Sequence, residues 1–238
     1  MEITPKPRSF GLVAGLGVGA GIFYYKALVD AHLARGLSPR LLMVHADVRY
    51  VGAQGAARNT KQLAEYLAGL LNQLALGGAE IATIPAFAPQ ICADELEAIT
   101  PLPLISLLDS ISAEVERRRL RRVALLGARV TMETQMFGRL RGTEVIMPTQ
   151  EEVDTIANIY VRVVEEAQIS PDDFERLRAL AHTLIKRERL DGIILAGTDL
   201  AFVFNPANAD FPHVDGARVH IESIMREIVA PLSGVGIA

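Results

Sequence analysis

Hydrophobic positions along the chain fall into short apolar runs that alternate with longer stretches of helical periodicity. The apolar runs predict strands at residues 11–14, 41–45, 81–84, 104–106, 123–126, 145–147 and 193–195, and another around Phe211. Between these runs, residues 59–76 place leucines on one helical face, and Ser170 with Pro171 marks the start of a further helix. Strands and helices in this alternation predict an α/β protein with parallel sheets covered by helices.

The same pattern starts again in the middle of the chain. The segment "RRVALLGARVTMETQ", residues 121–135, repeats the order of "RSFGLVAGLGVGAGIFYY", residues 8–25: basic residues, an apolar strand, a glycine turn and a helix. This repetition predicts two similar lobes, with a ligand cleft at the carboxyl ends of their strands. We expect residues 1–108 plus 209–238 to form the first lobe and residues 109–208 the second.

The composition of the chain argues against two classes of binding partner, nucleic acids and membranes. Half of the 238 residues are hydrophobic, which is enough for a sizeable core, and the net charge of -4 leaves no basic surface of the kind that nucleic-acid binding needs. No apolar segment is long and charge-free enough to span a bilayer, and the first residues lack the pattern of a signal peptide. We therefore expect a cytoplasmic protein that binds neither nucleic acid nor membrane.

The potential metal ligands are sparse. Cys92 is the single cysteine, which excludes an internal disulfide, and its place on an apolar helical face favours a buried structural thiol. The five histidines include no close pair at the spacing of metal ligands. The sequence therefore predicts no metal site.

Polar and glycine residues follow several of the predicted strands. Gly15 and Gly17 let the backbone approach a ligand and leave amides free for an anion at a helix start. The same turn weakly matches a dinucleotide-binding pattern, with Asp47 as the ribose ligand, so NAD-dependent oxidoreduction is the lowest-ranked hypothesis. After the next glycine turn, Arg129 and Thr131 are placed to bind a carboxylate, although Thr131 fits the role of a helix N-cap equally well.

The segment "DGIILAGTDL", residues 191–200, ends a predicted buried strand on a glycine, a hydroxyl and a carboxylate. Thr198 and Asp199 suit a ligand pocket, and the alternative is that Asp199 only stabilises a helix N-terminus. His45 is the best candidate acid or base because its charge changes near neutral pH, against the alternative of a hydrogen-bonded core histidine. Arg49 and Arg129 match the geometry of a carboxylate, although solvated arginines are more common.

These strand ends, together with "LLGARVTMETQMFGRLRGTEVIMP" at residues 125–148 and "FPHVDGARVHIESI" at residues 211–224, resemble the aspartate/glutamate racemase family. The likeness extends over nearly the whole chain and places Asp215 and His220 in register with the closing helix of the family. It implies a two-lobed fold, a small carboxylic or amino acid as substrate, no pyridoxal phosphate or other cofactor, and a homodimer. It also implies two cysteines that exchange the α-proton of the substrate from opposite faces.

The chain departs from the family at both cysteines. The Cys-Asn-Thr-Ala-His segment of the family corresponds here to Ala86-Phe87-Ala88-Pro89-Gln90, and the second cysteine corresponds to Gly197. Inversion of a stereocentre by proton exchange needs an acid and a base on opposite faces, which alanine and glycine do not supply. We therefore expect a rebuilt, more apolar site that does not racemise aspartate or glutamate.

Two function classes remain open. The first is an isomerase or lyase that acts on a small carboxylic or amino acid without the cysteine pair, and the second is a non-catalytic binding or regulatory protein that kept the fold. For the enzyme, the predicted catalytic residues are His45, Thr198 and Asp199. The predicted substrate-binding residues are Gly15, Gly17, Asp47, Arg49, Ala86, Phe87, Ala88, Gln90, Arg129, Thr131 and Gly197.

Overall fold

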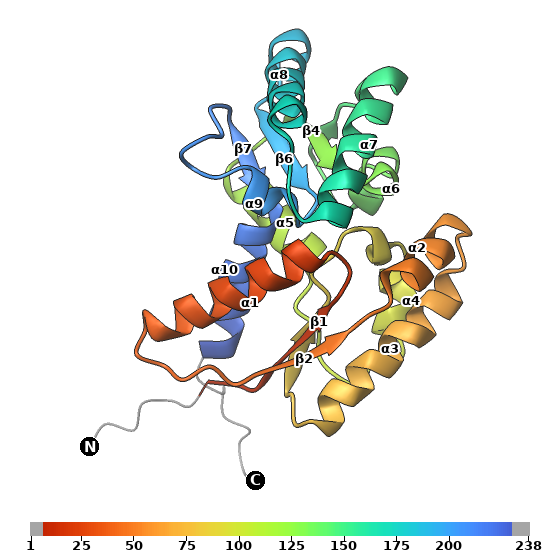
Figure 1. The fold of residues 1–238 in the computed structure, drawn as a ribbon, viewed down its shortest axis with the longest axis vertical. Helices are drawn as coiled ribbons and strands as arrows, with labels where there is room; N and C mark the ends of the chain where they lie inside the picture. Colours follow the sequence, from red (N-terminus) through yellow and green to blue (C-terminus); the bar gives the residue numbers. More distant parts are fainter. Residues whose placement is uncertain (1–6, 230–238) are drawn as a thin grey trace.

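The computed structural model describes residues 7–229 and contains two parallel sheets in separate lobes (Figure 1). The three-stranded sheet has the order β2-β1-β3 and consists of β1 (Phe10–Ala14), β2 (Leu41–His45) and β3 (Ile81–Thr83). The four-stranded sheet has the order β5-β4-β6-β7 and consists of β4 (Arg122–Gly127), β5 (Glu144–Val145), β6 (Gly192–Ala196) and β7 (His213–Asp215). Every pairing is parallel, so the predicted α/β class with two helix-flanked sheets is confirmed.

Helices cover both sheets. Those of the first half are α1 (Val18–Leu33), α2 (Val48–Ala56), α3 (Thr60–Leu76), the 3-10 turn η1 (Ala88–Cys92) and α4 (Ala93–Glu97). Those of the second half are α5 (Leu107–Arg117), α6 (Arg129–Glu133), the 3-10 turn η2 (Met136–Gly138), α7 (Gln150–Glu166), α8 (Pro171–Glu188), α9 (Leu200–Val203) and α10 (Gly216–Val229). No helix within residues 7–229 is long and apolar enough to cross a membrane.

Local sequence explains where the long helices begin. The predicted helix at residues 59–76 is α3, whose leucine face is buried. Ser170 accepts a hydrogen bond from the Asp173 amide and Pro171 opens α8, as predicted. Thr149 and Glu152 form a reciprocal capping box at the start of α7. These caps fix the start of α7, which forms one wall of the cavity described below.

The predicted strand at residues 104–106 is wrong. Leu104 makes only an isolated bridge to Ala82, because Pro103 has no amide hydrogen to donate and Ser106 already caps α5. Two other strands were predicted near their true places. The strand predicted at residues 145–147 is β5, which ends at Val145. The strand expected around Phe211 is β7, which begins at His213, after Pro212.

The last helix lies against both lobes. It follows β7, which is paired with β6, and its residues Ile221 and Ile224 pack in one buried cluster with Phe10 and Leu12 of β1. Figure 1 shows α10 running from the upper lobe down the side of the lower one. The predicted boundaries between the lobes, at residues 108/109 and 208/209, stay a prediction. They placed residues 213–215 in the first lobe, whereas these residues are hydrogen bonded into the four-stranded sheet.

Candidate active site

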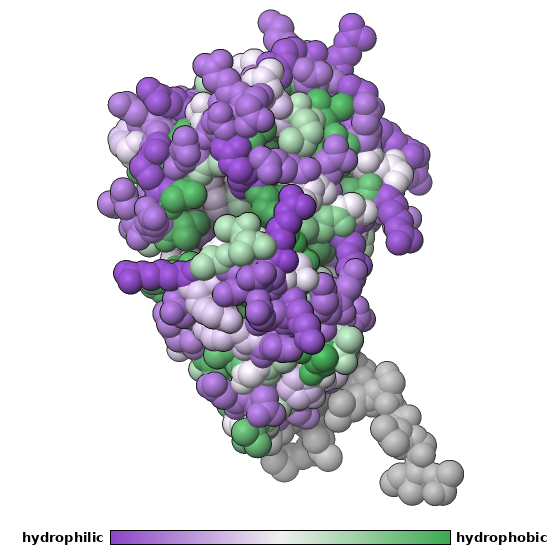
Figure 2. Space-filling model, turned by 90° about the vertical axis from the view of Figure 1, so that its right-hand side faces the viewer, coloured by the Kyte–Doolittle hydropathy of each residue, from purple (hydrophilic) through white to green (hydrophobic). Residues whose placement is uncertain are grey.

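A cavity of about 700 Å³ lies between the lobes at the carboxyl ends of their strands. The first lobe contributes residues 15–18 after β1, one face of α2 and residues 86–89 after β3. The second lobe contributes Ala128 and Arg129 at the start of α6 and one face of α7. Figure 2 looks at the molecule from the side of α2 and α3 and shows hydrophobic side chains at mid-height between the lobes.

The lining of this cavity is mostly apolar. Its hydrophobic members include Leu16, Val48, Val51, Phe87, Val161 and Val164. Arg129 donates to Asp154 over 2.6 Å and lies 3.4 Å from Glu133, so its charge is already compensated. Arg49 is exposed and forms no ion pair within residues 7–229. A carboxylate therefore finds a free guanidinium at Arg49 and hydrophobic surface around it.

The space beside Gly197 is filled by the ring of Tyr160. A Cβ atom added to Gly197 would lie 2.3 Å from the Tyr160 Cε2 atom and 2.9 Å from its hydroxyl oxygen, closer than real Cβ atoms approach. Tyr160 comes from α7, is 9% exposed and lines the cavity. At the other strand end, Ala86 also lines the cavity and is 5% exposed. A phenol thus occupies the place that the family resemblance gives to the second thiol.

Asp199 lies behind Tyr160 and is buried. Its carboxylate accepts a hydrogen bond of 2.9 Å from the Ala20 amide of α1 and a long one of 3.5 Å from the Tyr160 hydroxyl. A Cβ atom on Gly17 would come within 2.5 Å of the same carboxylate, so only glycine permits this contact between the lobes. The glycine turn, predicted to bind a ligand anion, therefore holds a carboxylate of the protein itself.

Burial sets the charge states of Asp199 and Tyr160. It raises the pKa of Asp199 to about 6, against the opposing effect of the hydrogen bonds from Ala20 and Tyr160. Burial and the nearby Asp199 charge raise the pKa of Tyr160 well above its ordinary value. Tyr160 is therefore a neutral phenol that keeps its proton, next to a carboxyl group that titrates near pH 6. The expected stabilisation of a helix N-terminus by Asp199 does occur, at α1 of the other lobe.

The remaining predicted catalytic residues lie outside the cavity. Thr198 is buried, and its hydroxyl donates to the Pro85 carbonyl over 3.0 Å, which ties the two strand ends together across the lobes. His45 is exposed and borders an adjoining cavity of about 290 Å³, whose lining it shares with Gly15. The alternative interpretation of His45 as a core histidine is wrong, because β2 is an edge strand and this side chain faces outward.

Three predicted binding residues do not line this cavity. Asp47 is the N-cap of α2 and accepts from the amides of Arg49 and Tyr50. Gln90 donates to the Ala86 and Ile84 carbonyls and lines a different cavity. Thr131 is buried inside α6, whose N-cap position is Ala128, so the alternative N-cap role is wrong. Among the described residues, the Thr131 hydroxyl has no hydrogen-bond partner.

The predicted site residues thus separate into two groups. Those that share the cavity are Gly15, Gly17, Arg49, Ala86, Phe87, Ala88 and Arg129. Those outside it are His45, Asp47, Gln90, Thr131, Gly197, Thr198 and Asp199. Sequence reasoning missed Tyr160 and Asn158, which reach the cavity from α7. Tyr160 lies on the buried stripe of α7, which has the pattern of ordinary core, so no signal in the sequence marked it.

Two further groups predicted from the sequence serve the packing. His220 is buried, its Nε2 atom donates to the Ile105 carbonyl over 3.1 Å, and its Nδ1 atom accepts from the Tyr24 hydroxyl over 3.0 Å. Burial lowers its pKa to about 4, which keeps the ring neutral. Cys92 is buried, and burial raises the pKa of its thiol to about 12, which makes it a poor nucleophile. Within residues 7–229, no group of three or more histidine, cysteine or acidic residues is arranged to hold a metal ion.

Two parallel-sheet lobes with a cavity at their facing strand ends define a racemase-type α/β fold. A sequence model of the Asp/Glu/hydantoin racemase family matches residues 13–224, and the chain belongs to this family. The fold is similar to that of a Yersinia pestis protein provisionally assigned as an Asp/Glu racemase, with a TM-score of 0.77, 24% identity, and coverage of 93% of this chain and 99% of that one.

Two other solved structures share the fold. An aspartate racemase homologue from Pyrococcus horikoshii matches with a TM-score of 0.74 and 21% identity, over 92% of this chain and 98% of that one. A liganded mutant of arylmalonate decarboxylase matches with a TM-score of 0.54 and 14% identity, over 94% of this chain and 93% of that one. The racemase-like fold therefore also occurs in a protein named as a lyase.

Proposed function

We propose that this protein is an isomerase or lyase that binds a small carboxylic acid with an apolar substituent and reacts at its α-carbon without a thiol pair. The observation that carries the proposal is the cavity itself, which combines apolar walls, the uncompensated Arg49 and a phenol in place of a sulfur. A lyase acting on a malonic acid with an apolar substituent is the first candidate, because the fold is shared with arylmalonate decarboxylase.

Binding follows from the distribution of polarity. A guanidinium and a carboxylate form charge-assisted hydrogen bonds, and Arg49 is available for them because it has no ion pair among the described residues. Burial of the apolar substituent against residues such as Val51 and Val161 contributes about 25 cal/mol per Å² of apolar surface removed from water. Aspartate and glutamate have no apolar substituent for this lining to bury, so they bind more weakly.

The reaction needs only one proton donor if a carboxyl group leaves. Loss of carbon dioxide breaks the bond between the α-carbon and the carboxyl carbon and leaves the electron pair on the α-carbon. That carbon then takes a proton from one face, whereas racemisation needs groups on both faces. Tyr160 is the donor that the geometry favours, because it lines the cavity, holds its proton at neutral pH and contacts Asp199. The protonated form of Asp199, which predominates below about pH 6, can return a proton to the phenolate.

The predicted catalytic residues take different roles in this proposal. Thr198 and Asp199 position the strand ends and the Tyr160 hydroxyl across the lobes. His45 remains a second acid or base, which acts from the adjoining cavity through the shared wall at Gly15. We also propose that the protein works in the cytoplasm and, on the family resemblance, that it is a homodimer without pyridoxal phosphate or another cofactor. Sedimentation of the purified protein tests the dimer, and its absorbance spectrum tests for pyridoxal phosphate.

A substrate panel tests the function. Phenylmalonate, phenylacetate, aspartate and glutamate are titrated into the protein by calorimetry, and each is incubated with it to follow loss of carbon dioxide and exchange of the α-proton. We expect phenylmalonate to bind more tightly than aspartate, with loss of carbon dioxide. Arg49→Ala is the test variant and Arg176→Ala, an exposed arginine on α8, is the matched control. Binding without turnover supports the non-catalytic alternative, and no binding of any panel member contradicts the proposal.

A further inference from the structure

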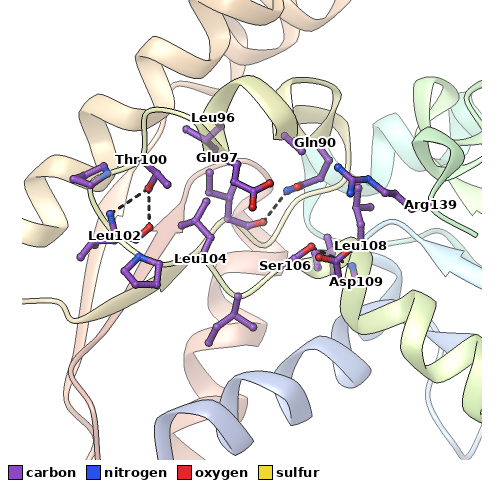
Figure 3. Close-up of a pocket in the computed structure, with 16 residues that line it drawn as sticks. Gln90, Leu96, Glu97, Thr100, Leu102, Leu104, Ser106, Leu108, Asp109 and Arg139 are labelled. Carbon is purple, nitrogen blue, oxygen red and sulfur yellow. Dashed lines mark hydrogen bonds between the residues drawn. The ribbon is translucent and has the colours of Figure 1, made fainter. Parts of the chain in front are cut away.

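A second cavity, of about 570 Å³, lies on the other side of the segment that follows β3 (Figure 3). Its walls are α4, residues 100–106, the first residues of α5 and Arg139, so both halves of the chain contribute to it. Its volume is within the range of about 300–1,000 Å³ that small-molecule sites occupy. The proposed function makes no use of this cavity.

The two cavities share a wall but are lined by different residues. Gln90 lines the second cavity, and its side-chain amide donates to the carbonyl of Ala86, which lines the first. The same amide donates to the Ile84 carbonyl over 3.2 Å. Gln90 therefore holds the backbone between the two spaces, and a ligand in the second cavity contacts neither Arg49 nor Tyr160.

Charges of both signs border this second cavity. Glu97 points toward it from α4, and Arg139 and Asp109 reach it from the other lobe (Figure 3). Glu97 and Asp109 form no ion pair within the part of the chain that the structure describes. Arg139 pairs over 2.6 Å with Asp94, whose side chain is 85% exposed, and such a solvated pair exchanges readily for another carboxylate.

Between these charges the wall is apolar. Leu96, Leu102, Leu104 and Leu108 line the cavity and surround its centre. A ligand that matches all three features carries an ammonium group for Glu97 or Asp109, a carboxylate for Arg139 and a compact apolar side chain for the leucines. Neither a simple anion nor a simple amine satisfies both signs of charge.

We propose that this second cavity is a binding site for a zwitterionic α-amino acid with an apolar side chain. Glu97 binds the ammonium group, Arg139 exchanges Asp94 for the carboxylate of the ligand, and the leucines pack on the side chain. The site lies where the two lobes meet, so an occupant contacts both. The inference is independent of the reaction proposed for the first cavity, because it depends on residues that line only the second.

Calorimetric titration of the full chain with L-leucine tests the inference, with 4-methylpentanoate and isopentylamine as probes that carry only one of the two charges. We expect leucine to bind at least tenfold more tightly than either single-charge probe. Arg139→Gln and Glu97→Gln each weaken leucine binding at least fivefold. The matched control Arg141→Gln removes an exposed arginine two positions away that does not line the cavity, and it leaves the affinity unchanged.

The first cavity supplies the remaining control. Arg49→Ala is expected to leave leucine binding unchanged, and circular dichroism confirms that each variant is folded. The inference is overturned if leucine does not bind, if a single-charge probe binds as tightly, or if Arg141→Gln has the effect of Arg139→Gln. Loss of leucine binding in Arg49→Ala alone also overturns it, because the amino acid would then occupy the first cavity. None of these outcomes bears on whether a malonic acid binds there.

Discussion

Ala86 and Gly197 hold matching places at the strand ends of the two lobes, but their surroundings are opposite. Ala86 lines the cavity, whereas the space that a side chain at Gly197 would need is filled by the Tyr160 ring. A simple loss of both thiols would leave room on both sides. The structure instead has room on one side and a buried phenol backed by Asp199 on the other. The site is therefore asymmetric, which suits proton delivery from one face and not inversion.

The strongest way to break this comparison is to put the thiols back. Gly197→Cys brings a Cβ atom to 2.3 Å from the Tyr160 ring, and we expect it to lower the free energy of unfolding by about 3 kcal/mol. Ala86→Cys adds one sulfur atom to a residue that lines the cavity, and we expect it to cost less than about 1 kcal/mol. Urea denaturation of the two variants measures the difference.

A double-mutant cycle shows whether the ring is the cause. Tyr160→Ala combined with Gly197→Cys should be destabilised less than the sum of the two single changes, by more than about 1 kcal/mol, because residues in contact do not act additively. Strict additivity, or equal costs for Ala86→Cys and Gly197→Cys, would contradict the asymmetry.

The second prediction separates the ring of Tyr160 from its hydroxyl. Tyr160→Phe keeps the packing beside Gly197 and removes the proposed proton donor. We expect kcat on the malonic acid identified by the panel to fall about 100-fold, with little change in the dissociation constant, since a general acid contributes about 10²–10⁴ in rate. Tyr50→Phe, an exposed tyrosine on α2 that does not line the cavity, is the control. An unchanged kcat in Tyr160→Phe would assign proton transfer to another group, of which His45 is the first to test.

The third prediction concerns the carboxyl group behind the phenol. Burial raises the pKa of Asp199 from 3.8 to about 6, so between these values the folded protein holds a proton that the unfolded chain releases. Stability from this group is therefore present below about pH 4 and is lost as the pH rises through about 6. Asp199→Asn does not titrate and keeps an oxygen for the Ala20 amide.

Denaturation across this range measures the effect. Relative to the wild type, Asp199→Asn should gain about 2 kcal/mol between pH 4 and pH 7 and nothing further above that. Asp191→Asn removes an exposed carboxylate held by backbone amides, whose pKa is lowered in the folded state. Its effect should have the opposite sign and fall mainly below about pH 4, so this variant should change little relative to the wild type between pH 4 and pH 7. A difference between Asp199→Asn and the wild type that does not depend on pH would contradict the buried environment of Asp199.

The smallest effect distinguishes the two arginines of the cavity. Arg49→Ala removes an uncompensated charge, and we expect it to weaken carboxylate binding about tenfold, or about 1.4 kcal/mol. Arg129→Ala removes a guanidinium that is already bound to Asp154, so it should weaken binding less than threefold. Calorimetric titration of both variants with one carboxylate from the substrate panel compares their affinities. A larger loss of affinity in Arg129→Ala than in Arg49→Ala would reverse the roles assigned to the two arginines.

The local hydrophobic pattern predicted the fold well because the periods of strands and helices depend on residues that are close together in the sequence. The leucines of α3 and the Ser170 cap of α8 are cases where sequence and structure agree. The strand expected at residues 104–106 is absent because Pro103 and the Ser106 cap compete with sheet pairing. Such failures are local and have a local chemical reason.

The site was harder to predict because its decisive contacts join distant parts of the chain. Asp199 meets Ala20 across 179 positions, so the glycine turn could not be recognised as already occupied. Tyr160 lies on a helical stripe that is indistinguishable from ordinary core, and only the fold brings its ring to Gly197. The missing thiols were visible in the sequence, whereas the residue that fills the second position was not.

The most direct test of the asymmetric site is proton NMR in heavy water with phenylmalonate, aspartate and glutamate as separate substrates, with a chiral shift reagent to distinguish the two configurations of the deuterated phenylacetate. We expect loss of carbon dioxide from phenylmalonate with deuterium delivered to a single face of the α-carbon, and no exchange of the α-proton of either amino acid. Exchange of the aspartate or glutamate α-proton, or equal delivery of deuterium to both faces, would contradict this expectation.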